Sequence, residues 1–251
     1  MRTTIITGGG SGIGAAVARR LAAADQCLML HGQGADEAGR GRLTAVATEC
    51  ANAGARVEIC FGDLATEGTA AALVRASRAS FGPVDAIVHA AGFADRRSFQ
   101  ELPPEKLQRA FAVMAASFHE LAAAAMTDLL RPLARVVAIS SFGAHRFAPG
   151  SIYPGSAAAK AALEALTKCL AIELAPSGAT ANIVVPGYTQ KDAGLTGALD
   201  AQAWQAAAKA NPLARLAEPD EVAAVVVFLL SAEASHITGA LLPVDGGLTL
   251  M

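Results

Sequence analysis

The sequence predicts an α/β protein in which a parallel sheet is covered by helices on both faces. Short, apolar, strand-like runs alternate along the chain with alanine-rich stretches of helical character. The stretches between the runs are long enough to cross over a sheet, as parallel neighbours require. The runs are apolar on consecutive residues, which is typical of strands buried on both faces. We therefore expect a doubly wound, three-layer α/β/α fold with ligands at the carboxyl ends of its strands.

The predicted elements follow one another in a regular order. Strands are expected at residues 3–7, 28–31, 56–60, 86–90, 135–139, 181–185 and 240–244. The longest helices are expected at about residues 104–130 and 156–175. No linker rich in proline, glycine or serine divides the chain, so we expect a single domain over residues 1–251. Residues 186–212 follow a strand and are rich in glycine, so a flexible substrate loop is expected there.

The composition indicates a protein that works in solution on small molecules. The 251-residue chain is 53% hydrophobic and 17% charged, with a mean hydropathy of +0.39. Its apolar residues come in short runs, well below the ~20 consecutive residues of a membrane span. A net charge of -2 with scattered lysine and arginine argues against nucleic acid as a partner. We expect a cytoplasmic protein with no membrane partner.

The cysteines give no sign of a metal site or a disulfide. Cys27, Cys50, Cys60 and Cys169 form no CxxC pair and lie in apolar surroundings. Zinc requires a cluster of ligands at short spacing. We therefore expect buried thiols and no bound metal.

A glycine-rich turn follows the first predicted strand. Residues 7–14 read TGGGSGIG and lead directly into the helical stretch AAVARRLAAA. Gly8, Gly12 and Gly14 let the backbone turn sharply and approach a pyrophosphate closely. The free amides at the start of the helix favour an anion at this position. A tight turn that serves only helix packing is the alternative, but the position in the first βα unit favours dinucleotide binding.

The residues at the end of the second predicted strand help to indicate whether NAD or NADP binds. An acid there accepts hydrogen bonds from the adenosine ribose of NAD, whereas a nearby arginine accommodates the 2′-phosphate of NADP. The chain has His31, Gly32 and Gln33 instead. Asp36 and Glu37 come later and suit the charged start of a helix. The turn therefore favours NADP(H) only slightly over NAD(H).

Several separate motifs resemble those of the short-chain dehydrogenase/reductase family over essentially the whole chain. TGGGSGIG matches the family's TGxxxGxG, and Asp63 in FGDL matches an aspartate that contacts adenine. Residues 89–92, HAAG, stand where the family has NNAG. ISS ends at Ser141, Pro-Gly at 186–187 follows a strand, and VDGG occupies 244–247. The resemblance implies a Rossmann-like fold, hydride transfer with a nicotinamide nucleotide, NAD(P)(H), and a homotetramer or homodimer.

The resemblance also assigns site residues. It implies that Ser141 orients the substrate oxygen and that Lys160 holds the nicotinamide ribose. With the glycine-rich turn, it implies a cofactor site made of Gly8, Ser11, Gly12, Ile13, Gly14, Gln33, Asp63, Leu64, Ala90, Gly92, Lys160, Pro186, Gly187 and Thr189. Two residues have plainer interpretations: His89 is expected to satisfy backbone groups rather than act as a base, and Asp63 alternatively caps a helix.

The catalytic segment departs from the family pattern in its spacing. The family's usual motif is YxxxK, but Ser156 stands four residues before Lys160. Tyr153 lies seven residues before that lysine, in YPGSAAAK, and seven residues are close to two helical turns. The phenol can therefore share the face of the lysine, and Pro154 suits the first turn of their helix. A nearby ammonium lowers the pKa of a phenol, which favours proton transfer.

This spacing is similar to that of the enoyl-acyl-carrier-protein reductase branch of the family. The family's usual asparagine falls at Met114, and its loss is also familiar in that branch; alternatively, Met114 only fills a gap in the core. We expect hydride transfer to or from a carbonyl or alcohol carbon, with Tyr153, Lys160 and Ser141 as the catalytic residues. The alternatives are reduction of a C=C bond conjugated to a thioester, with Tyr153 polarising the carbonyl, and nucleotide binding without turnover.

Overall fold

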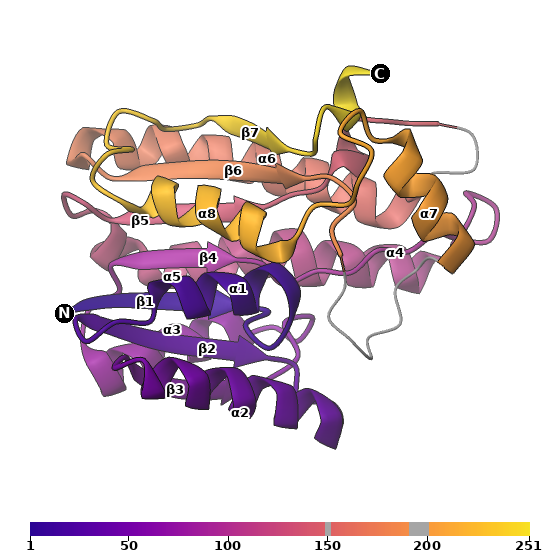
Figure 1. Cartoon of the computed structure of the whole chain (residues 1–251). Helices are drawn as coiled ribbons and strands as arrows, with labels where there is room; N and C mark the ends of the chain where they lie inside the picture. Colours follow the sequence, from indigo (N-terminus) through magenta and orange to yellow (C-terminus); the bar gives the residue numbers. More distant parts are fainter. Residues whose placement is uncertain (149–151, 191–200) are drawn as a thin grey trace.

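A seven-stranded parallel sheet forms the centre of the computed structural model, which describes residues 1–148, 152–190 and 201–251 (Figure 1). The strand order is β3-β2-β1-β4-β5-β6-β7, so the direction of winding reverses between β1 and β4. The strands are β1 (Arg2–Thr7), β2 (Gln26–Gly32), β3 (Arg56–Phe61), β4 (Ala86–His89), β5 (Arg135–Ile139), β6 (Thr180–Pro186) and β7 (Leu241–Val244). The doubly wound fold class is therefore confirmed, and each strand lies within about two residues of its expected position.

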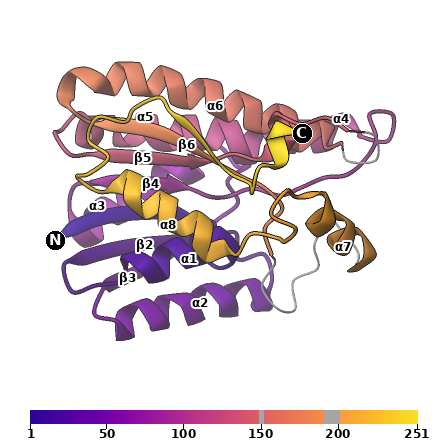
Figure 2. The same ribbon diagram turned by 45° about the horizontal axis from the view of Figure 1, so that its top comes forward.

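Helices cover both faces of the sheet. They are α1 (Gly12–Leu21), α2 (Glu37–Asn52), α3 (Thr69–Phe81), α4 (Pro104–Phe111), α5 (Ser117–Leu129), α6 (Pro154–Leu174), α7 (Ala201–Ala210) and α8 (Pro219–Leu230). The helices α1, α2 and α8 pack on one face, and α3, α5 and α6 pack on the other (Figures 1 and 2). The helix α7 lies beyond the carboxyl ends of the strands (Figure 1).

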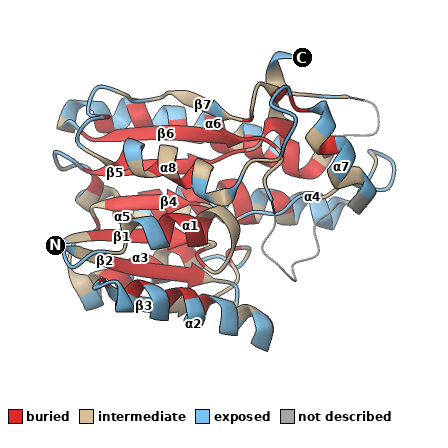
Figure 3. Cartoon of the chain, in the orientation of Figure 1, coloured by how far each residue is buried: buried red, intermediate tan, exposed pale blue. Residues whose placement is uncertain are grey.

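The apolar runs of the sequence form the buried layer between the helices. Every residue of β4, β5 and β6 is buried, as Figure 3 shows for the middle of the sheet. The register brings three strand ends together, because Thr7 pairs with His31 on one side and with His89 on the other. Side chains that follow β1, β2 and β4 therefore share one edge of the molecule.

The long helix expected at residues 104–130 is interrupted. A π-helical turn, Ala112–Ala116, separates α4 from α5. By length and composition alone, the stretch Pro104–Leu129 is apolar enough to cross a membrane, with a mean hydropathy of 1.3. Half of its most apolar window is buried inside the fold, and the stretch packs against α3 and α6, as core helices of globular proteins do.

Two sequence expectations need correction. All four cysteines are free, but only Cys27 and Cys50 are buried; Cys60 is half-buried and Cys169 is exposed on α6, because its helical position faces away from the sheet. Of the loop expected at 186–212, residues 191–200 lie outside the described residues and residues 201–210 form α7. In the described ranges, no group of three or more His, Cys, Asp or Glu side chains is arranged to hold a metal ion.

Candidate active site at the carboxyl edge of the sheet

The turn between β1 and α1 leaves room for a phosphate group. Gly8 and Gly12 have φ angles of 69° and 52°, in the left-handed region that favours glycine. A Cβ on Gly14 would lie 2.3 Å from the Gly8 carbonyl oxygen, whereas one on Gly12 would meet nothing within 4 Å. Ser11 precedes the helix without a side-chain capping bond. This open space at a helix amino terminus fits the pyrophosphate of a dinucleotide.

Three other predicted cofactor residues help to shape this edge by packing. Leu64 is buried beside α3, and Ile13 and Ala90 pack partly buried against the core on the α1 side. Ile13 and Ala90 therefore supply apolar surface on the α1 side of the sheet, and Leu64 supplies it on the α3 side.

Asp63 lies at the end of β3 in a network that the sequence did not reveal. Its carboxylate accepts hydrogen bonds from Arg109 Nη1 at 2.9 Å, from Gln33 Nε2 at 3.2 Å and from the Ala65 amide at 3.0 Å. Burial acts to raise the pKa of Asp63, but these donors outweigh it and hold the pKa below its usual range. The helix-cap interpretation of Asp63 is wrong, since α3 begins six residues later with Gly68 as its cap.

No local sequence pattern predicts the Arg109–Asp63 pair. The two residues are 46 positions apart, and Arg109 comes from α4. Gln33 also reaches Asp63, so the predicted adenosine residues of β2 and β3 are joined by hydrogen bonds.

The end of β2 carries a buried neutral histidine. The His31 Nε2 atom lies 3.1 Å from the Gly62 carbonyl oxygen, and burial lowers the pKa of His31 to about 4. Asp36 caps α2 by accepting from the Gly39 amide at 2.6 Å, as its position in the sequence indicated. The Arg40 guanidinium stacks over the Phe61 ring at 4.8 Å, which places a cation beside this turn.

His89 links the ends of β1 and β4. Its Nδ1 atom lies 3.1 Å from the Thr7 hydroxyl, which accepts from the Ala91 amide at 3.2 Å. Burial, with a contribution from Lys160, lowers the pKa of His89 to about 3. Among the described residues, no side chain or backbone group lies in good hydrogen-bonding geometry to its buried Nε2 atom. A neutral ring with these contacts agrees with a structural role rather than with a general base.

Lys160 projects from α6 toward the ends of β4 and β5. Its side chain is buried, and its Nζ atom donates to the Ile139 carbonyl at 2.6 Å. A Cβ on Gly92 would lie 3.0 Å from this Nζ atom, so the glycine gives the ammonium its space. Burial lowers the pKa of Lys160 to about 8, and the charge of Glu164 partly opposes this shift.

Ser141 and Tyr153 meet around Gly143. The Ser141 hydroxyl caps a 3-10 turn by accepting from the Gly143 amide at 3.2 Å. A Cβ on Gly143 would lie 3.5 Å from both the Ser141 Oγ and the Tyr153 Cδ2. The Tyr153 ring is buried and packs edge-on against Phe142, with 6.1 Å between the centroids. The two predicted catalytic residues thus flank Gly143, one from the turn that follows β5 and the other from the start of α6.

Ser156 and Met114 occupy the two positions at which the sequence departs from the family. Ser156 lies one turn before Lys160 on α6, is buried, and accepts from the Asp95 amide at 3.4 Å. Met114 is fully buried in the π-helical turn, and its Sδ would lie 3.6 Å from a Cβ on Gly92. Met114 therefore fills space beside Lys160.

Pro186 and Gly187 close the site from the end of β6. The Gly187 amide donates to the Val244 carbonyl at 3.0 Å, and a Cβ on Gly187 would lie 2.8 Å from the Asp245 Cα. The Thr189 hydroxyl donates to the Gly187 carbonyl at 3.1 Å. This turn can approach its neighbours closely only because it carries glycine.

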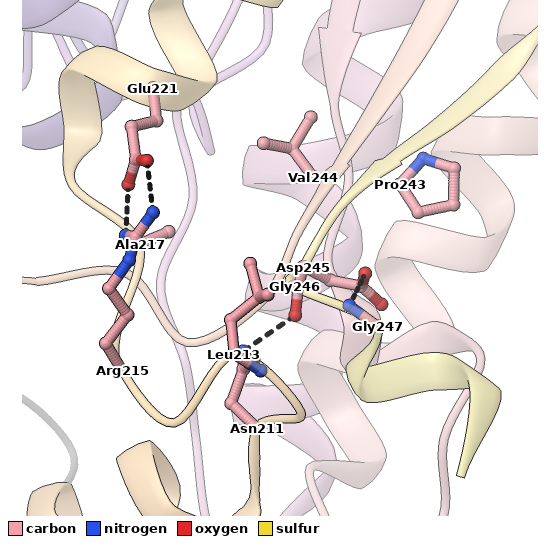
Figure 4. Close-up of a pocket in the computed structure, with 10 residues that line it drawn as sticks. All are labelled: Asn211, Leu213, Arg215, Ala217, Glu221, Pro243, Val244, Asp245, Gly246 and Gly247. Carbon is pink, nitrogen blue, oxygen red and sulfur yellow. Dashed lines mark hydrogen bonds and ion pairs between the residues drawn. The ribbon is translucent and has the colours of Figure 1, made fainter.

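A cavity of about 250 Å³ lies behind this turn, between the residues that follow α7 and those that follow β7 (Figure 4). Asn211 donates to the Asp245 carbonyl at 2.8 Å, and Arg215 pairs with Glu221 at 2.6 Å across its wall. The predicted catalytic and cofactor residues, all of them within the described ranges, do not line it. This cavity is therefore separate from the predicted catalytic and cofactor residues.

Comparisons with known proteins agree with this geometry. A family model described as enoyl-(acyl carrier protein) reductase matches residues 8–249. L-rhamnose 1-dehydrogenase (NAD(P)(+)) from Azotobacter vinelandii is 33% identical, and the match covers 98% of this chain and 96% of that protein. Acetoacetyl-CoA reductase from Allochromatium vinosum is 31% identical, with 98% of each chain covered.

Solved structures give the same result. A short-chain dehydrogenase/reductase from Serratia marcescens superposes with a TM-score of 0.89 at 29% identity, covering 99% of this chain and 98% of that chain. A blue fluorescent protein from a metagenomic library, in complex with NADPH, also gives 0.89 at 28% identity, with 98% and 97% covered. The chain therefore belongs to the short-chain dehydrogenase/reductase family of NAD(P)-dependent oxidoreductases.

Proposed function

We propose that this enzyme transfers hydride to or from a carbonyl or alcohol carbon of a small molecule, with Tyr153 exchanging the proton. The observation that supports this most directly is the meeting of Ser141 and Tyr153 around Gly143. Lys160 is fixed two residues away along β5, on the Ile139 carbonyl. Two relatives are named as an L-rhamnose 1-dehydrogenase and an acetoacetyl-CoA reductase, which supports this type of reaction.

The side chains divide the work as follows. The Ser141 hydroxyl donates a hydrogen bond to the substrate oxygen and orients it. In the direction of reduction, the Tyr153 phenol gives its proton to that oxygen as the carbon accepts hydride. The Lys160 ammonium binds the nicotinamide ribose and favours the phenolate that remains. In the direction of oxidation, the phenolate takes the proton back.

The cofactor site fits NAD(P)(H). The bound nucleotide supplies or accepts the hydride. Gly8, Ser11, Gly12, Ile13 and Gly14 would hold its pyrophosphate, and Gln33, Asp63 and Leu64 its adenosine. Ala90, Gly92, Lys160, Pro186, Gly187 and Thr189 would surround the nicotinamide.

We infer a slight preference for NADP(H). The first acid that follows β2 in the sequence, Asp36, is engaged as the cap of α2. Arg40 places a cation beside the same turn, and a structurally similar protein binds NADPH. Direct comparison of NADPH and NADH affinities by calorimetry tests this; clearly tighter binding of NADH would refute it.

Reduction of a C=C bond conjugated to a thioester is the second candidate. The seven-residue spacing of Tyr153 and Lys160 and the description of the matching family model both favour it. In this reaction Tyr153 would polarise the thioester carbonyl, and the negative charge that develops on the oxygen would be stabilised by hydrogen bonding.

A spectrophotometric comparison separates the candidates. NADPH and NADH oxidation would be followed with acetoacetyl and crotonyl thioesters, and NADP⁺ and NAD⁺ reduction with L-rhamnose. Turnover of the acetoacetyl thioester or the sugar supports carbonyl chemistry, whereas turnover of the crotonyl thioester alone supports the second candidate. Tyr153→Phe should lower kcat/KM by about 100-fold or more, while Ser156→Ala, its control, should change it little. Loss of activity only in Ser156→Ala would refute the role of Tyr153.

We further propose a cytoplasmic, single-domain protein of residues 1–251 that forms a homotetramer or homodimer, without nucleic acid or membrane partners. Ile172 on α6 is 77% exposed, and an alanine-lined groove of about 570 Å³ runs along α5. Both features suit packing between subunits. Light scattering after size-exclusion chromatography measures the mass; a monomer at all concentrations would contradict the proposal.

A further inference from the structure

The helix α6 clamps the end of β5 at two consecutive residues. Lys160 Nζ donates to the Ile139 carbonyl at 2.6 Å. One turn later on α6, the Glu164 carboxylate accepts from the Ser140 hydroxyl. The Ser140 amide is held from the other side by the Val184 carbonyl at 2.8 Å. The residue that follows this clamp is Ser141, so its direction depends on these contacts.

Glu164 is a buried carboxylate with two donors on one oxygen. Its side chain is 8% exposed, and its Oε1 atom accepts from both Ser140 and His145 Nε2, the latter at 2.8 Å. The His145 side chain is 30% exposed and therefore connects the carboxylate to solvent. A buried charge needs such partners, because desolvation without them is unfavourable.

The negative charge of Glu164 also stabilises the charged form of Lys160. Residues four apart on a helix are neighbours on one face. Burial removes the Lys160 ammonium from water and lowers its pKa to about 8, while the negative charge of Glu164 acts in the opposite direction. Without Glu164, burial would therefore lower the pKa of Lys160 further.

We propose that Glu164, held by Ser140 and His145, is a positioning residue that keeps the Lys160 ammonium charged and fixes the end of β5 from which Ser141 projects. The proposal rests on the proposed function, since it gives a purpose to the charge of Lys160.

The other titratable groups around this cluster belong to neighbouring elements. His89, at the end of β4, interacts with Lys160 and is neutral at physiological pH, with a pKa of about 3. Tyr153 starts the same helix as Lys160. Arg146 follows His145 and is turned toward the chain end, where its Nε lies 3.4 Å from the Met251 carbonyl oxygen. Among these groups and Glu164, the glutamate supplies the negative charge.

The charge of Lys160 can be measured without turnover. The chain has five lysines, so lysine labelled with ¹³C and ¹⁵N at the side-chain terminus gives a simple NMR titration, and Lys160→Met assigns the signal. The proposal predicts that Glu164→Gln lowers the Lys160 midpoint by about one pH unit. Glu164→Asp should retain most of the wild-type value. Glu173→Gln, an exposed control on the same helix, should leave it unchanged. Equal midpoints in the wild type and Glu164→Gln would overturn the proposal.

A second variant decides the matter if Glu164→Gln does not fold. Glu164→Met also removes the carboxylate and keeps a side chain of similar length, so it should lower the Lys160 midpoint in the same direction. An unchanged Lys160 midpoint in Glu164→Met would overturn the proposal. Activity is then compared as a function of pH: Glu164→Gln should lose kcat/KM at lower pH than the wild type. If the lysine shift occurs but no carbonyl substrate is turned over, the proposed function fails while the charge role of Glu164 stands.

Discussion

The two halves of the site at the carboxyl edge of the sheet are formed by different parts of the chain. Between β1 and α1 the site is made of backbone, and a Cβ on Gly14 would collide with the Gly8 carbonyl. Between β5 and α6 the site is made of side chains, which reach one another from several positions. Tyr153 approaches Ser141 from seven residues before Lys160, where the tyrosine of the family motif stands four residues before the lysine. Sites made of backbone permit few sequences, whereas sites made of side chains can be rearranged.

The largest expected effect comes from adding a methyl group to the phosphate turn. Gly14→Ala should weaken NADPH binding by at least about tenfold, because overpacking of about 1–3 kcal/mol displaces the turn. Gly41→Ala in α2 is the matched control, since a Cβ there meets nothing within 4 Å. Calorimetry gives the affinities and circular dichroism confirms folding. Wild-type affinity in Gly14→Ala would contradict the backbone argument.

Acid should destabilise the nucleotide half through His31. Burial lowers its pKa from 6.5 to about 4, so between these values the unfolded chain binds the proton more tightly. Stability is therefore complete above pH 6.5 and is lost as the pH falls toward 4. His31→Gln should reduce the loss between pH 7 and pH 5 by about 2 kcal/mol in urea unfolding. The exposed His236→Gln is the control; equal losses in both variants would refute the assignment.

The catalytic half should respond to alkali instead. The pKa of Lys160 is lowered to about 8, so its charge disappears as the pH rises through this value. If the charge is required, kcat/KM should fall above pH 8 by up to about tenfold per pH unit. Lys168→Met on the exposed side of α6 should leave this limb in place. A profile that stays flat to pH 9.5 would show that the charge is dispensable.

The smallest expected effect concerns Arg109 and Asp63. The two side chains are 36% and 33% exposed, so water and salt screen their attraction. Arg109→Met should lower the free energy of unfolding by less than about 1 kcal/mol, as measured by urea titration. Arg20→Met, which removes another paired surface arginine, provides the comparison. A loss above about 2 kcal/mol in Arg109→Met would indicate that this pair organises the adenosine end more strongly than its exposure suggests.

Local rules predicted most of the fold and the phosphate turn. The strands are continuous apolar runs, and the cap at Asp36 and the glycines of the first turn depend only on neighbouring residues. Contacts between distant segments could not be predicted in this way. Arg109 reaches Asp63, and Glu164 reaches His145 and Ser140, only because helices and strands fold together.

The conformation at Tyr153 differs from the one that its spacing predicts. A spacing of seven residues predicts that the phenol shares a helix face with Lys160. Tyr153 lies instead at the cap position, with φ of -139° and ψ of 62°, outside the regular helix. Its ring packs edge-on against Phe142, and regular helical periodicity does not apply at this position.

The π-helical turn at Ala112–Ala116 has a consequence for the rest of its helix. One extra residue in a turn advances the side chains that follow by about 100° around the axis. Before the turn, α4 packs on α6; after it, α5 packs on α3, with Phe118 and Leu121 buried. A helical wheel drawn without a break from Pro104 to Leu129 would therefore assign the wrong face to the interior. The buried faces of α4 and α5 therefore point in different directions around the helix axis, and one continuous stretch of chain packs against two different helices.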